Sequence, residues 1–172
     1  ELRTTPVLIG ELGFHGSSDV GKELHRLVTA LWVKERTVVG VLEALRSGHS
    51  YAVGEGDHHV QLRLEEFQVV CLDGTKSASI GDRLDPGGAR DLMVRLSVTA
   101  ADHGHHPAKV RVIRSGQVVA QSAGETPFRF DWTDTTAPMN ERMAYRVEIT
   151  GSGELLSNPI FVAPILELKA EG

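Results

Sequence analysis

Side chains that could bind a metal ion gather first in a polar loop near the start of the sequence. Asp19 ends the run Gly16 to Asp19, and both His15 and His25 lie within six residues of it. Carboxylate and neutral imidazole groups are common metal ligands, and functional side chains concentrate on loops that a scaffold positions. The spacing permits a metal site shared by Asp19, His15 and His25. The alternative is a solvated loop whose aspartate caps a turn.

Two further stretches are rich in histidine, from His103 to His106 and from Asp57 to His59. Neighbouring imidazoles can hold zinc, nickel or copper adventitiously, but a working site needs three or four ligands that converge from fixed elements. The first stretch precedes Pro107 in an expected loop between strands. We interpret these histidines as polar loop residues.

Nucleophiles and paired carboxylates offer little sign of catalysis. Cys71 is the only cysteine and lies in an alternating apolar run, which predicts a small buried side chain and excludes an intramolecular disulfide. The sequence contains no G-x-S-x-G, P-loop or H-E-x-x-H motif. The pairs Glu65/Glu66 and Asp131/Asp134 could act as acid and base, but their expected positions on solvent faces or strand ends favour surface charge.

The composition describes a globular protein without an affinity for polyanions. The chain has 172 residues, 41% of them apolar, and its 23 acidic and 18 basic residues give a formal charge of −5. This charge predicts neither a nucleic-acid partner nor binding to anionic lipid. No apolar run approaches the roughly 18 to 20 residues of a membrane-spanning helix, and the chain is too short for a complete (β/α)-barrel of about 250 residues.

The elements before Gly54 follow the pattern of an α/β unit. Apolar runs from Pro6 to Ile9 and from Leu27 to Val33 predict two strands, separated by the polar loop. A helix is expected next, with Thr37 as its N-cap and Gly48 just past its end. Its apolar positions have helical spacing: Val38, Val41, Leu42 and Leu45. Two strands and one helix cannot bury such a unit on both faces.

From His58 onward apolar residues recur with period two, which predicts an antiparallel β-sandwich of the immunoglobulin or fibronectin-III type. The alternation changes phase across Glu65 and Glu66, which suggests a bulge or a break between two strands. A hairpin is expected around the turn from Arg114 to Gln117. Five aromatic residues occupy expected inward positions: Phe67, Phe128, Phe130, Trp132 and Tyr145.

The segment from Thr37 to Val53 resembles the helical stretch near the C-terminal end of PHP-type metallohydrolase domains. In that family the stretch follows a loop of the form Gly-Ser-Asp-x-His, and the matching positions here run from Ser17 to Gly21. Some bacterial members then carry a β-sandwich, of which a hairpin similar to Val112–Val119 and an ending similar to Leu156–Val162 are typical. The resemblance covers most of the chain.

The resemblance implies a distorted α/β barrel that binds a cluster of divalent metals and hydrolyses phosphate or related esters. Asp19 matches one family ligand, but Gly21 stands where the family has a histidine ligand, and the other barrel ligands have no counterpart here. Each metal needs several converging ligands. We therefore expect no cofactor and no catalytic residue in this chain alone. A divalent metal, zinc, manganese or iron, is expected only where a parent protein keeps its PHP-like site.

The resulting division has three parts: a C-terminal remnant of a PHP-like α/β domain (1–54), a β-sandwich (55–164) and a tail (165–172). The fold class is therefore mainly β, an antiparallel sandwich preceded by a short strand-loop-strand-helix unit. Because the sequence starts at Glu1 and shows no signal-peptide pattern, we expect either a processed precursor or, in preference, a fragment of a longer protein.

The leading functional hypothesis is a non-catalytic accessory or interaction module of a PHP-like metal-dependent hydrolase. In one alternative, Asp19 and a nearby histidine contribute to a phosphoesterase site that the missing barrel completes. A carbohydrate-binding sandwich is a second alternative, weakened because the aromatic residues alternate as core positions do. The expected partner is the remainder of the PHP-like domain or a second copy of the chain, with no nucleic acid and no membrane.

Overall fold

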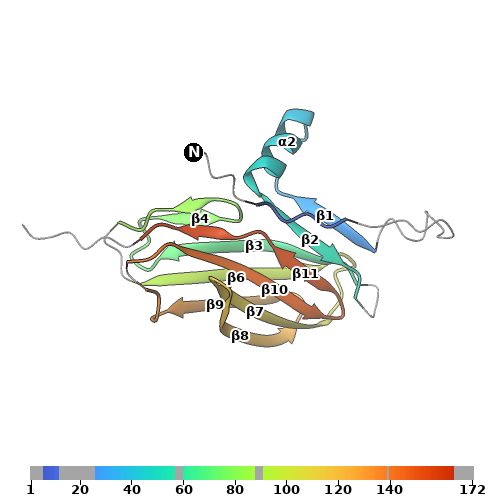
Figure 1. The fold of residues 1–172 in the computed structure, drawn as a ribbon. Coiled ribbons are helices and arrows are strands. Elements are labelled where there is room, and N and C mark those ends of the chain that lie inside the picture. The colour runs from blue at the N-terminus through green and yellow to red at the C-terminus, as the bar shows by residue number, and fades with distance from the viewer. Residues whose placement is uncertain (1–5, 12–25, 57–59, 88–90, 139, 165–172) are drawn as a thin grey trace, which may run out of the picture.

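Two sheets packed face to face contain most of the chain (Figure 1). The computed structural model describes residues 6–11, 26–56, 60–87, 91–138 and 140–164. Sheet A holds eight strands: β1 (Leu27–Leu31), β2 (Ser50–Gly54), β5 (Arg83–Leu84), β7 (Pro107–Arg114), β8 (Gln117–Glu125), β10 (Met143–Gly151), β11 (Glu154–Ser157) and β12 (Ile160–Val162). Sheet B holds four: β3 (Leu62–Cys71), β4 (Ser77–Ser79), β6 (Leu92–Ala100) and β9 (Phe128–Asp134). The predicted mainly-β, sandwich-like fold is confirmed.

The order of the strands explains how the chain closes its core. Sheet B runs β4-β3-β6-β9, all antiparallel. In sheet A, β10 pairs with β7 along one side and with β11 and then β12 along the other, and β8 follows β7. The short β5 is parallel to β12. Sheet A continues from β11 through β2 to β1.

Period-two apolar residues fill the space between the sheets, as the sequence predicts. Every second side chain of β6 is fully buried, and the intervening ones are only partly covered. Of the five aromatic residues expected inside, Phe67 and Tyr145 are fully buried and the other three pack half-buried against the core. The removal of these side chains from water is the main stabilising contribution.

The predicted irregularities fall where the sequence places them. β3 is one continuous strand whose register with β6 shifts between Leu64 and Glu66, which confirms a bulge. The β7–β8 hairpin turns at Ser115 and Gly116, with φ of 47° and 89°. Positive φ at both turn residues matches the twist of the paired strands.

Helix α2 (Val38–Ser47) has the predicted ends. The Thr37 hydroxyl accepts a hydrogen bond from Gly40 N at 3.1 Å, and Gly48 adopts φ 73° while its N–H bonds the Ala44 and Leu45 carbonyls. These contacts satisfy backbone groups that the helix leaves free. In Figure 1 the helix stands out from the sheets above β1.

The strands around α2 are part of the sandwich. β2 pairs with β1 on one side and with β11 on the other, so the predicted boundary after Gly54 coincides with the end of a strand of sheet A. The expected strand at Pro6 to Ile9 forms no ladder. This segment is instead held by side chains, because Asn158 bonds both backbone groups of Leu8 and the Thr29 hydroxyl bonds Gly10.

Candidate functional site

The candidate metal ligands Asp19, His15 and His25 lie outside the described residues, as does the stretch from Asp57 to His59. Within the part of the chain that the structure describes, no three His, Cys, Asp or Glu side chains come together as a metal site would require. A site at Asp19 thus stays a prediction.

The loop from His103 to His106 is held by hydrogen bonds within itself and to Thr126. His106 Nε2 lies 2.8 Å from Asp102 Oδ2, and Gly104 N donates to the other carboxylate oxygen at 2.9 Å. These two contacts hold the pKa of Asp102 below its usual value. Thr126 Oγ1 accepts from His106 N and donates to Gly104 O. The contacts favour a structural loop.

The paired carboxylates divide into surface charges and one buried group. Glu65 accepts a hydrogen bond from Thr99, and Glu66 pairs with the exposed Arg129 at 3.2 Å. Arg129 also lies 3.8 Å from Asp131. Asp134 differs, since only 1% of it is exposed. The prediction of surface charge is wrong for Asp134, because the end of β9 is covered by sheet A.

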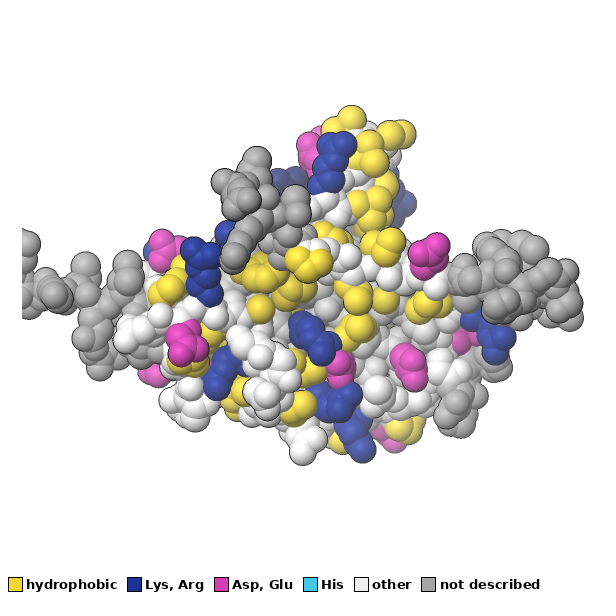
Figure 2. Space-filling view, viewed as in Figure 1, with side chains coloured by type: hydrophobic (Ala, Val, Ile, Leu, Met, Phe, Trp, Pro, Cys, Tyr) yellow, Lys and Arg dark blue, Asp and Glu magenta, His cyan; other side chains and the backbone are white. Residues whose placement is uncertain are grey.

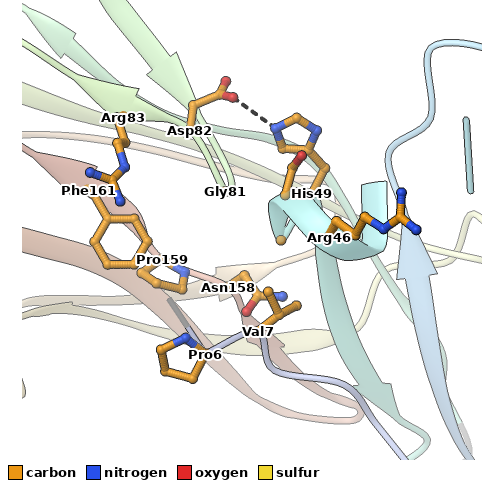
Figure 3. A pocket seen from close by; sticks show the side chains of 12 residues that line it. Pro6, Val7, Arg46, His49, Gly81, Asp82, Arg83, Asn158, Pro159 and Phe161 are labelled. Atoms are coloured by element: carbon orange, nitrogen blue, oxygen red, sulfur yellow. Dashed lines mark hydrogen bonds and ion pairs between the residues drawn. The ribbon is translucent and has the colours of Figure 1, made fainter. Parts of the chain in front are cut away.

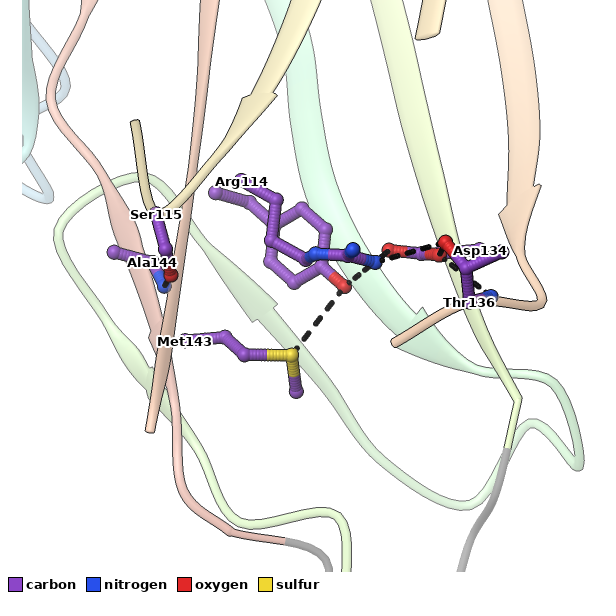
Figure 4. A network of polar contacts seen from close by, with 7 residues as sticks. Arg114, Ser115, Asp134, Thr136, Met143 and Ala144 are labelled. Carbon is purple, nitrogen blue, oxygen red and sulfur yellow. Dashed lines mark hydrogen bonds and ion pairs between the residues drawn. The ribbon is translucent and has the colours of Figure 1, made fainter. Parts of the chain in front are cut away.

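A buried polar network surrounds Asp134 (Figure 4). Asp134 Oδ2 accepts hydrogen bonds from Tyr145 Oη at 2.8 Å and from Arg114 Nη1, and Oδ1 accepts from Thr136 N at 2.9 Å and Thr136 Oγ1 at 3.0 Å. Arg114 and Tyr145 face each other on β7 and β10 of sheet A, whereas Asp134 ends β9 of sheet B. The network therefore joins the two sheets.

The electrostatics of this network favour an ionised aspartate. Burial acts to raise the pKa of Asp134, but the hydrogen bonds from Tyr145, Arg114 and Thr136 outweigh it, so the pKa lies below its usual value. Burial, and then the adjoining Asp134 carboxylate, raise the pKa of Tyr145. A carboxylate that is covered and saturated with donors cannot take a proton from a substrate. We interpret the network as structural.

Cys71 is fully buried, as predicted. Burial raises the pKa of its thiol, with a smaller contribution from the nearby Asp73. Reactive cysteines have a lowered pKa and some exposure. The thiol is therefore a packing group.

Among the described residues, the arrangement most like a catalytic one lies in a hollow of about 420 Å³ between the end of α2 and the sandwich (Figure 3). His49 Nε2 is 2.8 Å from Asp82 Oδ1 there, and Figure 3 shows the Arg83 side chain near the Phe161 ring, 6.0 Å from its centroid. No hydroxyl or thiol of the described chain is hydrogen-bonded to His49. A histidine with an orienting carboxylate but no nucleophile lacks one part of a triad.

The same hollow marks a close junction between α2 and the sandwich. A Cβ on Gly81 would lie 2.5 Å from Ser47 O, and Gly81 has φ 82°. Asn158, 1% exposed, donates to Ser50 O at 3.0 Å and to Ser50 Oγ at 2.8 Å. These contacts favour a structural role for His49 and Asp82, which fasten the helix end to the turn before β5.

The apolar side of α2 is uncovered, which the sequence does not predict. Val38 is 77% and Val39 64% exposed, Val41 and Leu42 are also exposed, and Ala44 alone on the helix is buried. Figure 2 shows hydrophobic side chains on the protruding helix and on the sheet below it. A helix with this pattern normally packs its apolar stripe against a core, and exposed apolar patches mark interaction surfaces.

The outer edge of β1 is the second open feature. Trp32 N donates to His49 O and Glu55 N donates to Arg26 O, so the even-numbered residues of this segment bond β2. By alternation, the backbone groups of Leu27, Thr29 and Leu31 point to the other side. Among the described residues no strand pairs with that edge.

Comparison with known proteins adds no family. No helix of the described part is long and apolar enough to cross a membrane. The sequence matches no family model, and no curated protein matches it either.

Proposed function

We propose that the chain is a non-catalytic accessory module of a PHP-like metal-dependent hydrolase, with an immunoglobulin-like sandwich that holds the end of the α/β domain. The observation that carries the proposal is the open edge of β1. This edge belongs to the sandwich sheet through β2 and β11 and has no described partner strand. A strand of the α/β domain would continue sheet A there.

The composition of β1 supports this role. Its sequence, Leu-Val-Thr-Ala-Leu, has no charge and no proline, although exposed edges are usually protected by such residues, by bulges or by shortness. Two other sheet edges are short, since β4 has three residues and β5 has two. The edge strand β9 carries Arg129 and Asp131 on its outer side. The fifth edge, β8, is longer and carries a charge only at Glu125. β1 shares this lack of charge and differs from β8 in lying next to α2.

The donor set does not fit a resident metal cluster. In the loop that matches the family's ligands, Gly21 stands two residues after Asp19, where a histidine is expected, and glycine has no donor side chain. Metal ions in hydrolases need several converging ligands. We therefore assign no catalytic step to this chain, and any divalent metal would be held by the α/β domain.

A binding experiment tests the proposed attachment. The probe is a PHP-type α/β domain truncated before its last strand and helix, and its affinity for the chain is measured by titration calorimetry. We expect binding that Leu31→Pro abolishes, because proline removes an N–H that points to the open edge. The control Leu31→Val keeps the N–H and should bind as the parent chain does. No binding by the parent chain contradicts the attachment.

A phosphatase assay separates this proposal from a catalytic role for Asp19. The chain and its Asp19→Ala variant are each incubated with zinc, manganese or iron and a chromogenic phosphate ester. We expect equal, background rates. Hydrolysis by the parent chain that Asp19→Ala removes would favour a metal site at the predicted loop instead.

A further inference from the structure

The outer edge of β1 presents a regular row of backbone groups. In the described part of the chain, Leu27, Thr29 and Leu31 point their N–H and C=O groups away from β2, and no strand receives them. The other long uncharged edge, β8, is less regular, because its register with β7 shifts between Val112 and Ile113. Such irregularities protect an edge from further pairing. Of these two edges, β1 is therefore the better template for another strand.

The sequence of β1 complements itself when two copies run antiparallel. A two-fold axis through Thr29 brings Leu27 of one copy opposite Leu31 of the other, and Thr29 opposite its own counterpart. Val28 then lies opposite Ala30. Apolar pairs and threonine pairs across neighbouring strands stabilise antiparallel sheets, and no charged residue of β1 meets another.

The hydrogen-bonding groups match in the same register. Leu27, Thr29 and Leu31 point their groups outwards and are also the residues that meet in pairs, so each pair can exchange two backbone hydrogen bonds. Moving the axis to Val28 or Ala30 would leave one outward-pointing residue of each strand without a partner in β1. The strand therefore favours a single register with its own copy.

The pairing also covers core side chains that the single chain leaves half-buried. Val28, Ala30 and Trp32 pack against the hydrophobic core beside β2 but are only partly buried. With the axis through Thr29, side chains of the second copy stand beside them, because neighbouring strands lie about 4.8 Å apart. Removing this apolar surface from water stabilises the contact.

We propose that the chain by itself forms a two-fold dimer in which the β1 strands of two copies pair antiparallel, with the axis through Thr29. Sheet A of each copy then continues into sheet A of the other. The inference uses the same open edge as the proposed attachment, but it concerns the chain without its α/β domain. A strand of that domain and a second copy compete for the edge.

Sedimentation equilibrium of the full chain tests the dimer. We expect a concentration-dependent species with twice the 18.7 kDa mass of the chain. Leu27→Lys/Leu31→Lys places like charges opposite each other twice, whereas the matched variant Leu27→Glu/Leu31→Lys places opposite charges there. The first should dimerise at least about tenfold more weakly than the second. A monomer at every concentration up to about 1 mM, or equal dimerisation by the two variants, overturns the inference.

A cysteine on the axis tests the register. Thr29→Cys places two thiols opposite each other with their Cα atoms about 5.5 Å apart, within reach of a disulfide. In the control Leu27→Cys, each thiol lies about 13 Å along the strand from its counterpart. The native Cys71 is buried and does not compete. Under a mild oxidant we expect a covalent dimer of Thr29→Cys only. Equal cross-linking of the two variants, or none, overturns the register.

Two separate readouts distinguish this dimer from the proposed attachment. Calorimetry reports binding of the truncated α/β domain, and sedimentation of the chain alone reports the dimer. A dimer that does not bind the domain contradicts the attachment and supports the pairing of β1 with its own copy. A chain that binds the domain but stays monomeric alone overturns the dimer and leaves the attachment in place.

Discussion

Replacing Asp134 with asparagine removes the charge from the network that joins the two sheets. Asp134→Asn keeps the shape of the side chain but replaces one accepting oxygen with an NH₂ group, which can only donate. This group must then face other hydrogen-bond donors, either Arg114 and Tyr145 or Thr136. Breaking a buried ion pair costs about 3 to 5 kcal/mol. We expect the lower end, about 3 kcal/mol, because the Arg114 side chain is 17% exposed and keeps a hydrogen bond to Thr136.

The measurement is urea unfolding followed by tryptophan fluorescence. In a thermal unfolding experiment on a chain of this size, the same loss of about 3 kcal/mol would lower the melting temperature by about 6 to 12 °C. Asp131→Asn is the matched control on the same strand, because its long ion pair with Arg129 is exposed and contributes at most about 1 kcal/mol. If Asp134→Asn costs no more than Asp131→Asn, the reasoning about the network is refuted.

The pH dependence of the same variant has a definite sign. The folded pKa of Asp134 is lowered, so the stabilisation is present above the unfolded pKa of about 3.9 and is lost as the pH falls through the folded value. The difference in unfolding free energy between the parent chain and Asp134→Asn should therefore shrink below about pH 4. A difference that stays constant into strong acid would contradict an ionised Asp134.

Three further substitutions test the junction and the helix, each by urea unfolding. Gly81→Ala should cost at least about 2 kcal/mol because the new Cβ meets Ser47 O, whereas Gly116→Ala, with φ 89° and no atom near, should cost about 1 kcal/mol. Asn158→Ala should cost about 3 kcal/mol and expose residues 6–11 to limited proteolysis, since buried partners lose their hydrogen bonds. Thr37→Ala removes an N-cap contact and should cost about 1 kcal/mol. An unchanged urea midpoint would show that the N-cap does not stabilise the fold.

Local sequence patterns were sufficient to predict most of the secondary-structure elements of this fold. The ends of α2, the bulge near Glu65 and the turn at Ser115 and Gly116 depend on neighbouring residues, so spacing and turn chemistry predict them. The apolar stripe of α2 predicts a helix equally well, but spacing does not say what covers the stripe. The structure leaves it open to solvent among the described residues.

Contacts between distant residues were beyond local patterns. Asp134 lies 20 residues from Arg114 and 11 from Tyr145, and only the packing of β9 against sheet A brings the three together. From the sequence alone, an aspartate at the end of a strand is predicted to lie on the surface. Only the structure shows that another strand covers it. The pairing of β2 with β11 also has no local signal, because each strand is five residues or shorter.

The place of β2 beside β11 sets an order on folding during synthesis. Asn158 bonds Ser50 across 108 residues and Leu8 across 150. The ribosome therefore releases the β1–α2–β2 segment long before its sheet neighbour exists. Contacts between residues so far apart in the sequence form slowly. Until they form, the uncovered strand edges are prone to pair with the wrong partner. The nascent β1–α2–β2 segment is thus the part of this chain for which a holding chaperone, or slow emergence of β11, would matter most.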